Sequence, residues 1–219
     1  MKEALRAAAV IVVVASLAAG ASLWLGRRTE SVPSGSSVVR GQVLGRTDAP
    51  VTLVEYGDYE CPPCASVAPI VGKLLEKYPE TLKYEYRHFP LTGVHPGAMR
   101  AAMAAEAAGQ QGKFWEMHKF LLANQGKLIR DPDAEGKLTE MGKLIDVDAE
   151  SFSKSLRSAE IEQKIAKQVA QAKSEGIEGV PTFLVNGMKI EQAPNTFEGF
   201  DALIMDELKR LKLRRTRGN

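Results

Sequence analysis

The residues best suited to chemistry in this sequence are its two cysteines, Cys61 and Cys64, in the run Cys-Pro-Pro-Cys. Two intervening residues on the first turn of a helix bring the sulfur atoms within bonding distance. One thiolate can attack a disulfide of another molecule, and the second thiol can resolve the mixed disulfide that results. We predict Cys61 as the attacking thiol and Cys64, one turn further in, as the resolving thiol.

The elements around the pair predict how it is held. Val51 to Tyr56 is short and rich in β-branched and aromatic residues, which indicates a buried strand, and Gly57 with Asp58 interrupts it. Apolar residues after Cys64 recur at helical spacing, so a helix follows. Cys61 then lies at a helix N-terminus, where unpaired N–H groups and the helix dipole favour a thiolate and lower the thiol pKa.

Two sets of residues narrow the possible uses of the cysteine pair: the two prolines between the cysteines, and the histidines of the chain. Pro62 and Pro63 have preset φ angles and no N–H donor, which suits the first helical positions. Half of a zinc site and an inert structural disulfide are alternative uses of the pair. The chain has no second cysteine pair, and His88, His95 and His118 lack zinc-finger spacing. We therefore predict a redox use and no resident metal.

A second informative stretch ends in a hairpin. Phe183 to Val185 predicts a strand, Asn186-Gly187 a two-residue turn, and Met188 to Ile190 the returning strand. Pro181 either simply starts the first of these strands or forms a cis peptide bond with Val180 beside the cysteines. In the second interpretation, the Val180 backbone offers a bound substrate a strand edge to pair with.

The remaining pattern predicts one more strand and a large amount of helix. Leu82 to Phe89 alternates between apolar and polar residues, as a strand does. From about 97 to 175 the apolar residues follow helical spacing, with a turn at Asp131-Pro132 and an N-cap at Asp148. Thr196 to about Leu213 predicts a final helix.

The N-terminus carries an apolar segment. Ala7 to Gly26 contains no charged residue, and about 20 such residues suffice to cross a membrane as a helix. Ala19-Gly20-Ala21 resembles a signal-peptidase site, whereas Trp24 beyond it suits a membrane interface. We predict either a retained membrane anchor or a cleaved signal within residues 1–28, and we favour the anchor.

The rest of the chain is predicted to form one domain. Residues 29–46 are rich in Ser, Pro and Gly and indicate a linker, in which Val38 to Leu44 is either a short edge strand or a tether. The domain follows over 47–213, and 214–219 is a basic tail. A net charge of +2 with 26% charged residues does not indicate a nucleic-acid binder. Two cysteines in one motif exclude a disulfide-stapled scaffold.

The order of elements resembles that of a known fold. A strand, a Cys-Pro-Pro-Cys helix, a strand, a helical region, a Val-Pro-Thr-Phe hairpin and a last helix resemble the thioredoxin fold, an α/β fold. The long stretch before Pro181 leaves room for an inserted α-helical subdomain. This inserted form is similar to the DsbA-like thiol:disulfide oxidoreductases of bacterial envelopes. The resemblance covers about Arg46 to Leu211, and three strings agree with it: Asp48–Tyr56, Tyr86–Leu91 and Gly112–His118.

This resemblance implies roles for individual residues. It implies Cys61 as nucleophile, Cys64 as resolving thiol and Pro181 as a cis proline. Glu55 matches a buried acid that exchanges a proton with the inner thiol, which agrees with the raised pKa expected of a buried carboxylate. A Glu55 side chain that faces water is the equal alternative. Substrate contacts are implied for Val180, Thr182, Pro62 and Pro63.

Three neighbouring residues have less specific expectations. We expect Asp58 and Glu60 to be exposed and to oppose thiolate formation slightly, because both are negative. We expect His88 to be a packed, hydrogen-bonded histidine. Pro63 stands where the strongest oxidants of the family have a histidine that stabilises the thiolate, so the couple should be less oxidising than theirs.

The predicted function is an enzyme on the extracytoplasmic face of the cell envelope. It would exchange disulfides with cysteine-containing polypeptides, using the Cys61–Cys64 disulfide and no other cofactor, and pass electrons to an unidentified envelope redox partner. We expect a monomer that binds no nucleic acid. Oxidase, isomerase and reductase directions stay open. The alternatives are a membrane-tethered copper(I) metallochaperone, in which the two sulfurs are soft ligands, and a thioredoxin-fold protein whose cysteine pair only adds stability.

Overall fold

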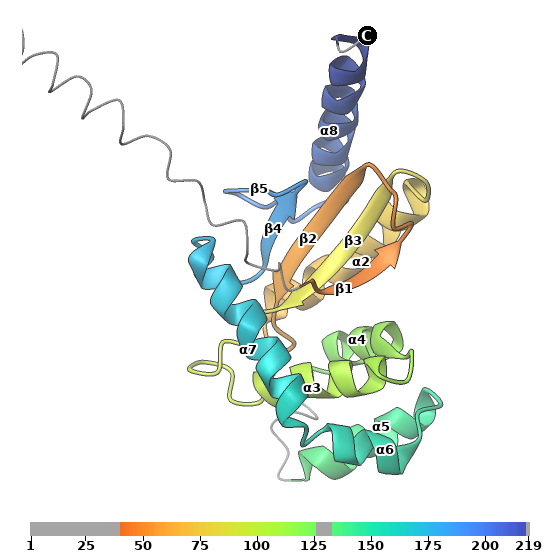
Figure 1. The fold of residues 1–219 in the computed structure, drawn as a ribbon, viewed down its shortest axis with the longest axis vertical. Coiled ribbons are helices and arrows are strands. Elements are labelled where there is room, and N and C mark those ends of the chain that lie inside the picture. Colours follow the sequence, from red (N-terminus) through yellow and green to blue (C-terminus); the bar gives the residue numbers. More distant parts are fainter. Residues whose placement is uncertain (1–39, 126–132, 218–219) are drawn as a thin grey trace, which may run out of the picture. The chain divides into compact units, whose positions relative to one another are not determined.

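The computed structural model describes residues 40–125 and 133–217 (Figure 1). The predicted N-terminal anchor or signal, most of the linker and the Asp131-Pro132 turn lie outside these residues. The strands are β1 (Gln42–Gly45), β2 (Val51–Gly57), β3 (Leu82–His88), β4 (Thr182–Val185) and β5 (Met188–Lys189). The helices are α2 (Pro62–Lys77), α3 (Ala98–Gly109), α4 (Phe114–Ala123), α5 (Ala134–Leu144), α6 (Ala149–Ser155), α7 (Ala159–Ser174) and α8 (Phe197–Arg217).

The five strands form one mixed sheet in the order β1-β3-β2-β4-β5. The central strand β2 runs parallel to β3 and antiparallel to β4, while β1 and β5 form antiparallel edges. Side chains alternate between the two faces. Leu53 contributes to the larger core, which includes residues of α2, α3, α4 and α8, and Val54 and Tyr56 contribute to a smaller one that includes Ala172 of α7. Both faces of β2 are therefore buried, as its apolar sequence predicts.

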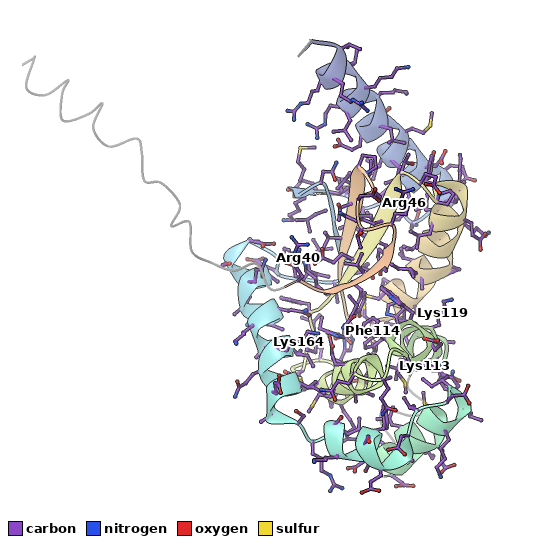
Figure 2. All side chains as sticks on the ribbon, turned by 45° about the vertical axis from the view of Figure 1, so that its right-hand side comes forward. Arg40, Arg46, Lys113, Phe114, Lys119 and Lys164 are labelled. Carbon is purple, nitrogen blue, oxygen red and sulfur yellow. The ribbon has the colours of Figure 1, made fainter. Side chains whose placement is uncertain are left out.

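The predicted insertion is present as the helices α3 to α7, which follow β3 and precede β4 (Figure 1). The alanines of α3 are all buried, and their small side chains let neighbouring helices approach closely. Phe114 begins α4 where the helical segment meets the sheet (Figure 2), with its ring centroid 6.3 Å from that of Tyr86 and 5.9 Å from that of His88. Aromatic packing thus joins the insertion to β3.

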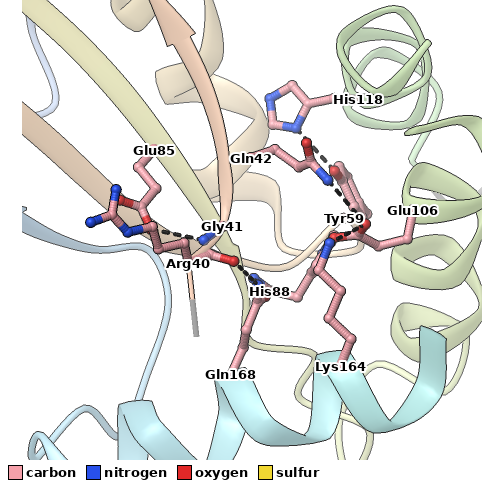
Figure 3. A network of polar contacts seen from close by, with 10 residues as sticks. All are labelled: Arg40, Gly41, Gln42, Tyr59, Glu85, His88, Glu106, His118, Lys164 and Gln168. Carbon is pink, nitrogen blue, oxygen red and sulfur yellow. Dashed lines mark hydrogen bonds and ion pairs between the residues drawn. The ribbon is translucent and has the colours of Figure 1, made fainter. Parts of the chain in front are cut away.

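A buried polar network makes a second connection between the helices and the sheet (Figure 3). Glu106 of α3 accepts hydrogen bonds from Gln42 of β1 at 3.1 Å and from Lys164 of α7 at 2.7 Å, and its other oxygen lies 3.1 Å from Nε2 of His88. Gln168 of α7 accepts from the backbone N–H of His88 at 2.7 Å. These contacts tie two strands to α3 and α7, and they confirm the prediction of a packed, hydrogen-bonded His88.

Most of the predicted element boundaries agree with the structure. The second strand spans Leu82–His88, and Asp148 caps α6 by accepting the backbone N–H of Ser151 at 2.9 Å. The hairpin turn at Asn186 and Gly187 has φ values of +48° and +82°, which asparagine and glycine tolerate best. The sequence predicts a helical pattern that continues past Asp148 without a break. In the structure this segment forms two helices, α6 and α7, because Ser158 caps the start of α7.

Two predicted boundaries at the chain ends differ from the structure. Gln42–Gly45, within the predicted linker, pairs with β3 as an edge strand, so one of the two alternatives for this segment is confirmed. Helix α8 continues to Arg217, so the basic residues predicted as a tail are helical up to that residue. Lys and Arg are good helix formers, and no Gly or Pro interrupts them there. Within residues 40–125 and 133–217, no helix combines the length and apolar character needed to cross a bilayer.

Candidate active site

The two cysteines lie at the junction between β2 and α2. Gly57 ends the strand, and Cys61 is the N-cap of the helix, with extended φ and ψ of −81° and 115°. Pro62 and Pro63 occupy the first two helical positions, where no N–H partner is required. Cys64 follows in the first turn and is fully buried. Both cysteines are free thiols.

The loop before β4 lies against this junction. The Val180–Pro181 peptide bond is cis, as the second of the two interpretations of Pro181 predicts. The thiol of Cys61 donates to the carbonyl oxygen of Val180 with a sulfur-to-oxygen distance of 3.7 Å. Thr182 closes the loop because its hydroxyl donates to the carbonyl of Gly179 at 2.7 Å. The fold thus brings the two informative stretches of the sequence together.

The two thiols have opposite acidities. A hydrogen bond from the Cys64 thiol lowers the pKa of Cys61 to about 6, the backbone N–H of Cys64 adds to this effect, and burial opposes it. The same hydrogen bond, burial and the negative charge of Glu55 raise the pKa of Cys64 far above its usual value. The pair therefore has one thiol that ionises readily and one that keeps its proton, as an attacking and a resolving thiol require.

Glu55 is buried beneath the pair. Its side chain shares the core face of β2 with Leu53, and its Oε2 accepts the hydroxyl hydrogen of Tyr84 at 2.7 Å. Burial raises the pKa of Glu55 to about 8, although the Tyr84 hydrogen bond acts in the opposite direction. The alternative of a Glu55 that faces water is therefore wrong. A carboxyl with this pKa can hold or release a proton near neutral pH.

The expectation that Asp58 and Glu60 are exposed is wrong. Both are buried, with 2% and 5% of their surface accessible. Asp58 accepts the backbone N–H of Glu60 at 2.7 Å and that of Leu91 at 2.8 Å, and Nδ1 of His95 lies 2.9 Å from its Oδ2. Glu60 accepts the N–H of Gly97 at 2.6 Å. The loop after β3 supplies the donors at Leu91, His95 and Gly97. The prediction from the sequence did not include this loop folding over the two carboxylates.

Three other residues at the site were not predicted from the sequence. Gln125, after α4, donates from its amide to the carbonyl of Cys61 at 2.8 Å. Tyr84 holds Glu55, and His95 holds Asp58. The one available signal was strand alternation, which places Tyr84 on the same face of the sheet as Glu55. The positions of Gln125 and His95 depend on loop packing, which has no period in the sequence.

His88 and His118 serve the packing rather than the sulfur pair. His118 is buried, its Nδ1 lies 3.0 Å from the Tyr59 hydroxyl, and burial lowers the pKa of His118 to about 3. The neutral ring then accepts the tyrosine hydrogen. Among the residues that the structure describes, no group of three or more His, Cys, Asp or Glu side chains is placed to hold a metal ion.

The fold and site together define a thioredoxin-fold protein with an inserted helical segment and a cysteine pair at a helix N-terminus. A family model described as Thioredoxin matches residues 37–206. The chain therefore belongs to the thioredoxin family, and its predicted resemblance to the DsbA-like oxidoreductases is confirmed.

Solved structures with the same fold support this assignment. Oxidised BdbD from Bacillus subtilis is 26% identical with a TM-score of 0.67, over 78% of this chain and 97% of that one. A thioredoxin-like oxidoreductase from Silicibacter pomeroyi DSS-3 is 29% identical with a TM-score of 0.64, over 78% and 91% of the two chains. The α-DsbA1 protein of Wolbachia pipientis, at 20% identity and a TM-score of 0.68 over 78% and 92%, shares the fold.

Curated relatives with higher identity are much longer proteins. A Na⁺/H⁺ antiporter NhaA 3 of Salinispora tropica is 42% identical over 175 residues, which cover 80% of this chain and 26% of the antiporter. An antiporter NhaA 1 of Mycolicibacterium gilvum is 36% identical over 152 residues, 68% of this chain and 24% of that protein. The chain thus spans about a quarter of the length of these relatives. The name antiporter describes the whole of each relative, and the segment that matches this chain is only one part of it.

Proposed function

We propose that this chain is a thiol:disulfide oxidoreductase that exchanges disulfides with cysteine-containing polypeptides of the cell envelope through Cys61 and Cys64. The observation that carries the proposal is the position of the Cys61 sulfur, at the N-terminus of α2 and 3.7 Å from the carbonyl oxygen of Val180. A pKa of about 6 lets the Cys61 thiol lose its proton near neutral pH. A thiolate of this kind is both a nucleophile and a good leaving group.

In the oxidising direction the cycle starts from the Cys61–Cys64 disulfide. A substrate thiolate attacks the Cys61 sulfur, the bond between the two cysteines breaks, and Cys64 leaves as a thiolate that takes up a proton. A second substrate thiolate then attacks the substrate sulfur of the mixed disulfide, and Cys61 leaves as a thiolate. Two electrons pass from two substrate thiols to the cysteine pair, and the substrate gains a disulfide.

Glu55 fits the proton transfer in this cycle. It lies on the buried side of the pair, its negative charge acts on Cys64, and its pKa of about 8 lets it exchange a proton near neutral pH. We assign it as the group that protonates Cys64 when the disulfide opens. The stabilised Cys61 thiolate favours the reduced pair, and hence the oxidising direction, while a disulfide of a separate envelope redox partner takes the two electrons away by the same exchange.

The substrate is held beside the cis proline. An extended polypeptide attached to Cys61 would lie along Val180 and Thr182 on one side and pass over Pro62 and Pro63 on the other. The contact between the Cys61 thiol and the Val180 carbonyl supports this placement, because the loop already touches the sulfur that forms the mixed disulfide. Backbone pairing would make binding independent of the substrate's side chains, which suits an enzyme with many substrates.

An extracytoplasmic position at the membrane completes the proposal. The uncharged run from Ala7 to Gly26 supports a membrane anchor or signal, and disulfides persist outside the cytoplasm. The curated relatives match this chain over one part of much longer proteins named Na⁺/H⁺ antiporters, and this also supports a membrane location.

Two measurements test the function. In the first, the purified chain is equilibrated with mixtures of reduced and oxidised glutathione. In the second, the chain with its Cys61–Cys64 disulfide formed is added to a reduced peptide that has two cysteines. We expect a reversible two-electron equilibrium and conversion of the peptide to its disulfide form, with no conversion by Cys61→Ser. Peptide oxidation at an equal rate by Cys61→Ser would contradict the proposal, as would tight stoichiometric copper(I) binding without any exchange.

A further inference from the structure

The loop between β2 and α2 carries two buried carboxylates next to the reactive sulfur. Asp58 and Glu60 precede Cys61, and the backbone N–H of Cys61 donates to the carbonyl of Asp58 at 3.2 Å. The side chain of Asp58 is fully buried and accepts hydrogen bonds on both oxygens. The negative charge of Asp58 works against a thiolate on Cys61, so a compensating positive charge is of direct use to the chemistry.

His95 is the side chain placed to supply that charge. It belongs to the loop between β3 and α3, and its Nδ1 lies 2.9 Å from Oδ2 of Asp58. The carboxylate accepts the Nδ1 hydrogen and so fixes the orientation of the ring. The side chain of His95 is 17% exposed, against none of the Asp58 side chain, so the ring extends from the buried carboxylate to solvent.

Among the residues that the structure describes, the other groups that contact Cys61 carry no positive charge. Cys64 on α2 donates a thiol hydrogen, Glu55 on β2 is neutral or negative, and the loop before β4 presents the Val180 carbonyl. The amide of Gln125 is bound to the Cys61 carbonyl. Asp58 raises the pKa of Cys61 and His95 lowers it, which is the sign expected if both charges act on the sulfur.

We propose that Asp58 and His95 are positioning residues: Asp58 holds the His95 ring against the loop that carries Cys61, and the charge of that ring when protonated sets how strongly the reduced pair is favoured. The inference rests on the proposed function. The position between the cysteines is taken by Pro63, which has no charge to offer. His95 acts on the same sulfur from a different loop, and Asp58 determines where that charge is.

The test measures the thiolate directly. Thiolate absorbance of the reduced chain is followed against pH, and the glutathione equilibrium is measured at pH 7, for the unaltered chain, His95→Gln and His95→Lys. Gln keeps a hydrogen-bond donor without the charge, and Lys keeps a charge without the ring. Lys143→Gln is the matched control, because it removes a positive charge from an exposed pair on α5.

We expect His95→Gln to raise the pKa of Cys61 and to lower the ratio of reduced to oxidised chain by about threefold to tenfold, since tenfold corresponds to one pKa unit. His95→Lys should retain most of the original ratio, and Lys143→Gln all of it. An unchanged Cys61 titration in His95→Gln would overturn the inference, as would His95→Lys behaving like His95→Gln. The absorbance titration needs no substrate, so it tests this inference even if peptide exchange fails and the proposed function is wrong.

Discussion

The carbonyl oxygen of Val180 lies 3.7 Å from the sulfur of Cys61, although 119 residues separate the two in the chain. The sheet explains this contact. Strands β2 and β4 are antiparallel neighbours, with Tyr56 paired to Thr182, so the end of β2 and the start of β4 meet at one edge of the sheet. The loop that leaves β2 carries the cysteines, and the loop that enters β4 carries the cis proline. The whole helical insertion lies between them in sequence without separating them in space.

Replacing the resolving thiol should trap the reaction halfway. In Cys64→Ala, a substrate disulfide attacked by Cys61 forms a mixed disulfide that no second thiol of the chain can release. We expect a covalent adduct with a disulfide-containing peptide, visible on a non-reducing gel and removed by reductant. Cys61→Ala should form no such adduct, because the remaining thiol is buried and its pKa is raised. Adducts of equal yield in both variants would show that the two thiols do not have distinct roles.

Glu55 should make stability depend on pH. The folded chain keeps the Glu55 proton up to a pKa of about 8, whereas the unfolded chain releases it near 4.5. The folded state binds more protons between these values, so the free energy of unfolding falls as pH rises through this window, by at most about 1.4 kcal/mol per pH unit. Glu55→Gln has no titrating group there and should lose this slope.

Urea unfolding of the reduced chain at pH 5, 6, 7 and 8 measures the effect. The gain of Glu55→Gln over the unaltered chain should grow with pH. The exposed Glu76 on α2 offers a control, and Glu76→Gln should leave the slope as it is. Parallel pH profiles for Glu55→Gln and the unaltered chain would mean that Glu55 is ionised at neutral pH.

The sequence predicted those parts of the site that local patterns determine. A short run of β-branched and aromatic residues identified β2, and strand alternation identified β3. Asparagine and glycine identified the hairpin, and the prolines suited the start of α2. These signals come from neighbouring residues, so they are present before any tertiary contact forms. The roles of Cys61 and Cys64 follow from the same local arrangement of strand, loop and helix.

The carboxylates before Cys61 show what local patterns miss. The sequence predicts that Asp58 and Glu60 are exposed, because acidic residues in loops usually are. Apart from the Glu60 N–H, their donors lie 33 to 37 residues further on, at Leu91, His95 and Gly97, in a loop with no periodic pattern. Whether a buried charge is tolerated depends on partners of this kind, and one sequence does not indicate which loop folds over which.

The contact of Glu106 with Lys164 and His88 should matter more than a surface ion pair. Burial alone would raise the pKa of Glu106, but the hydrogen bond and charge of His88 and the charge of Lys164 hold it at about 2. Glu106→Gln keeps the shape and leaves the partners with an amide, so we expect a loss of about 3 kcal/mol at pH 7. The stabilisation is complete above about pH 4.5 and disappears as pH falls toward 2.

Urea unfolding at pH 7 and pH 3 tests this. The difference between Glu106→Gln and the unaltered chain should be smaller at pH 3. Glu140→Gln, which breaks the exposed pair with Lys143 at 2.6 Å, is the matched control and should change stability little. If both variants behaved alike, the network in Figure 3 would contribute no more than a surface pair does.

Gly57 should be the least replaceable glycine next to the active site. A Cβ atom at this position would lie 2.5 Å from Cε2 and 2.8 Å from the hydroxyl oxygen of Tyr86. The Tyr86 side chain is fully buried among aromatic rings and cannot move aside cheaply, so we expect Gly57→Ala to lose about 1–3 kcal/mol. Gly72 on the exposed face of α2 has open space around it, and Gly72→Ala should instead gain about 0.5–1 kcal/mol from helix propensity. Thermal unfolding of both variants measures the contrast, and a neutral Gly57→Ala would mean that Tyr86 has room to shift at the end of β2.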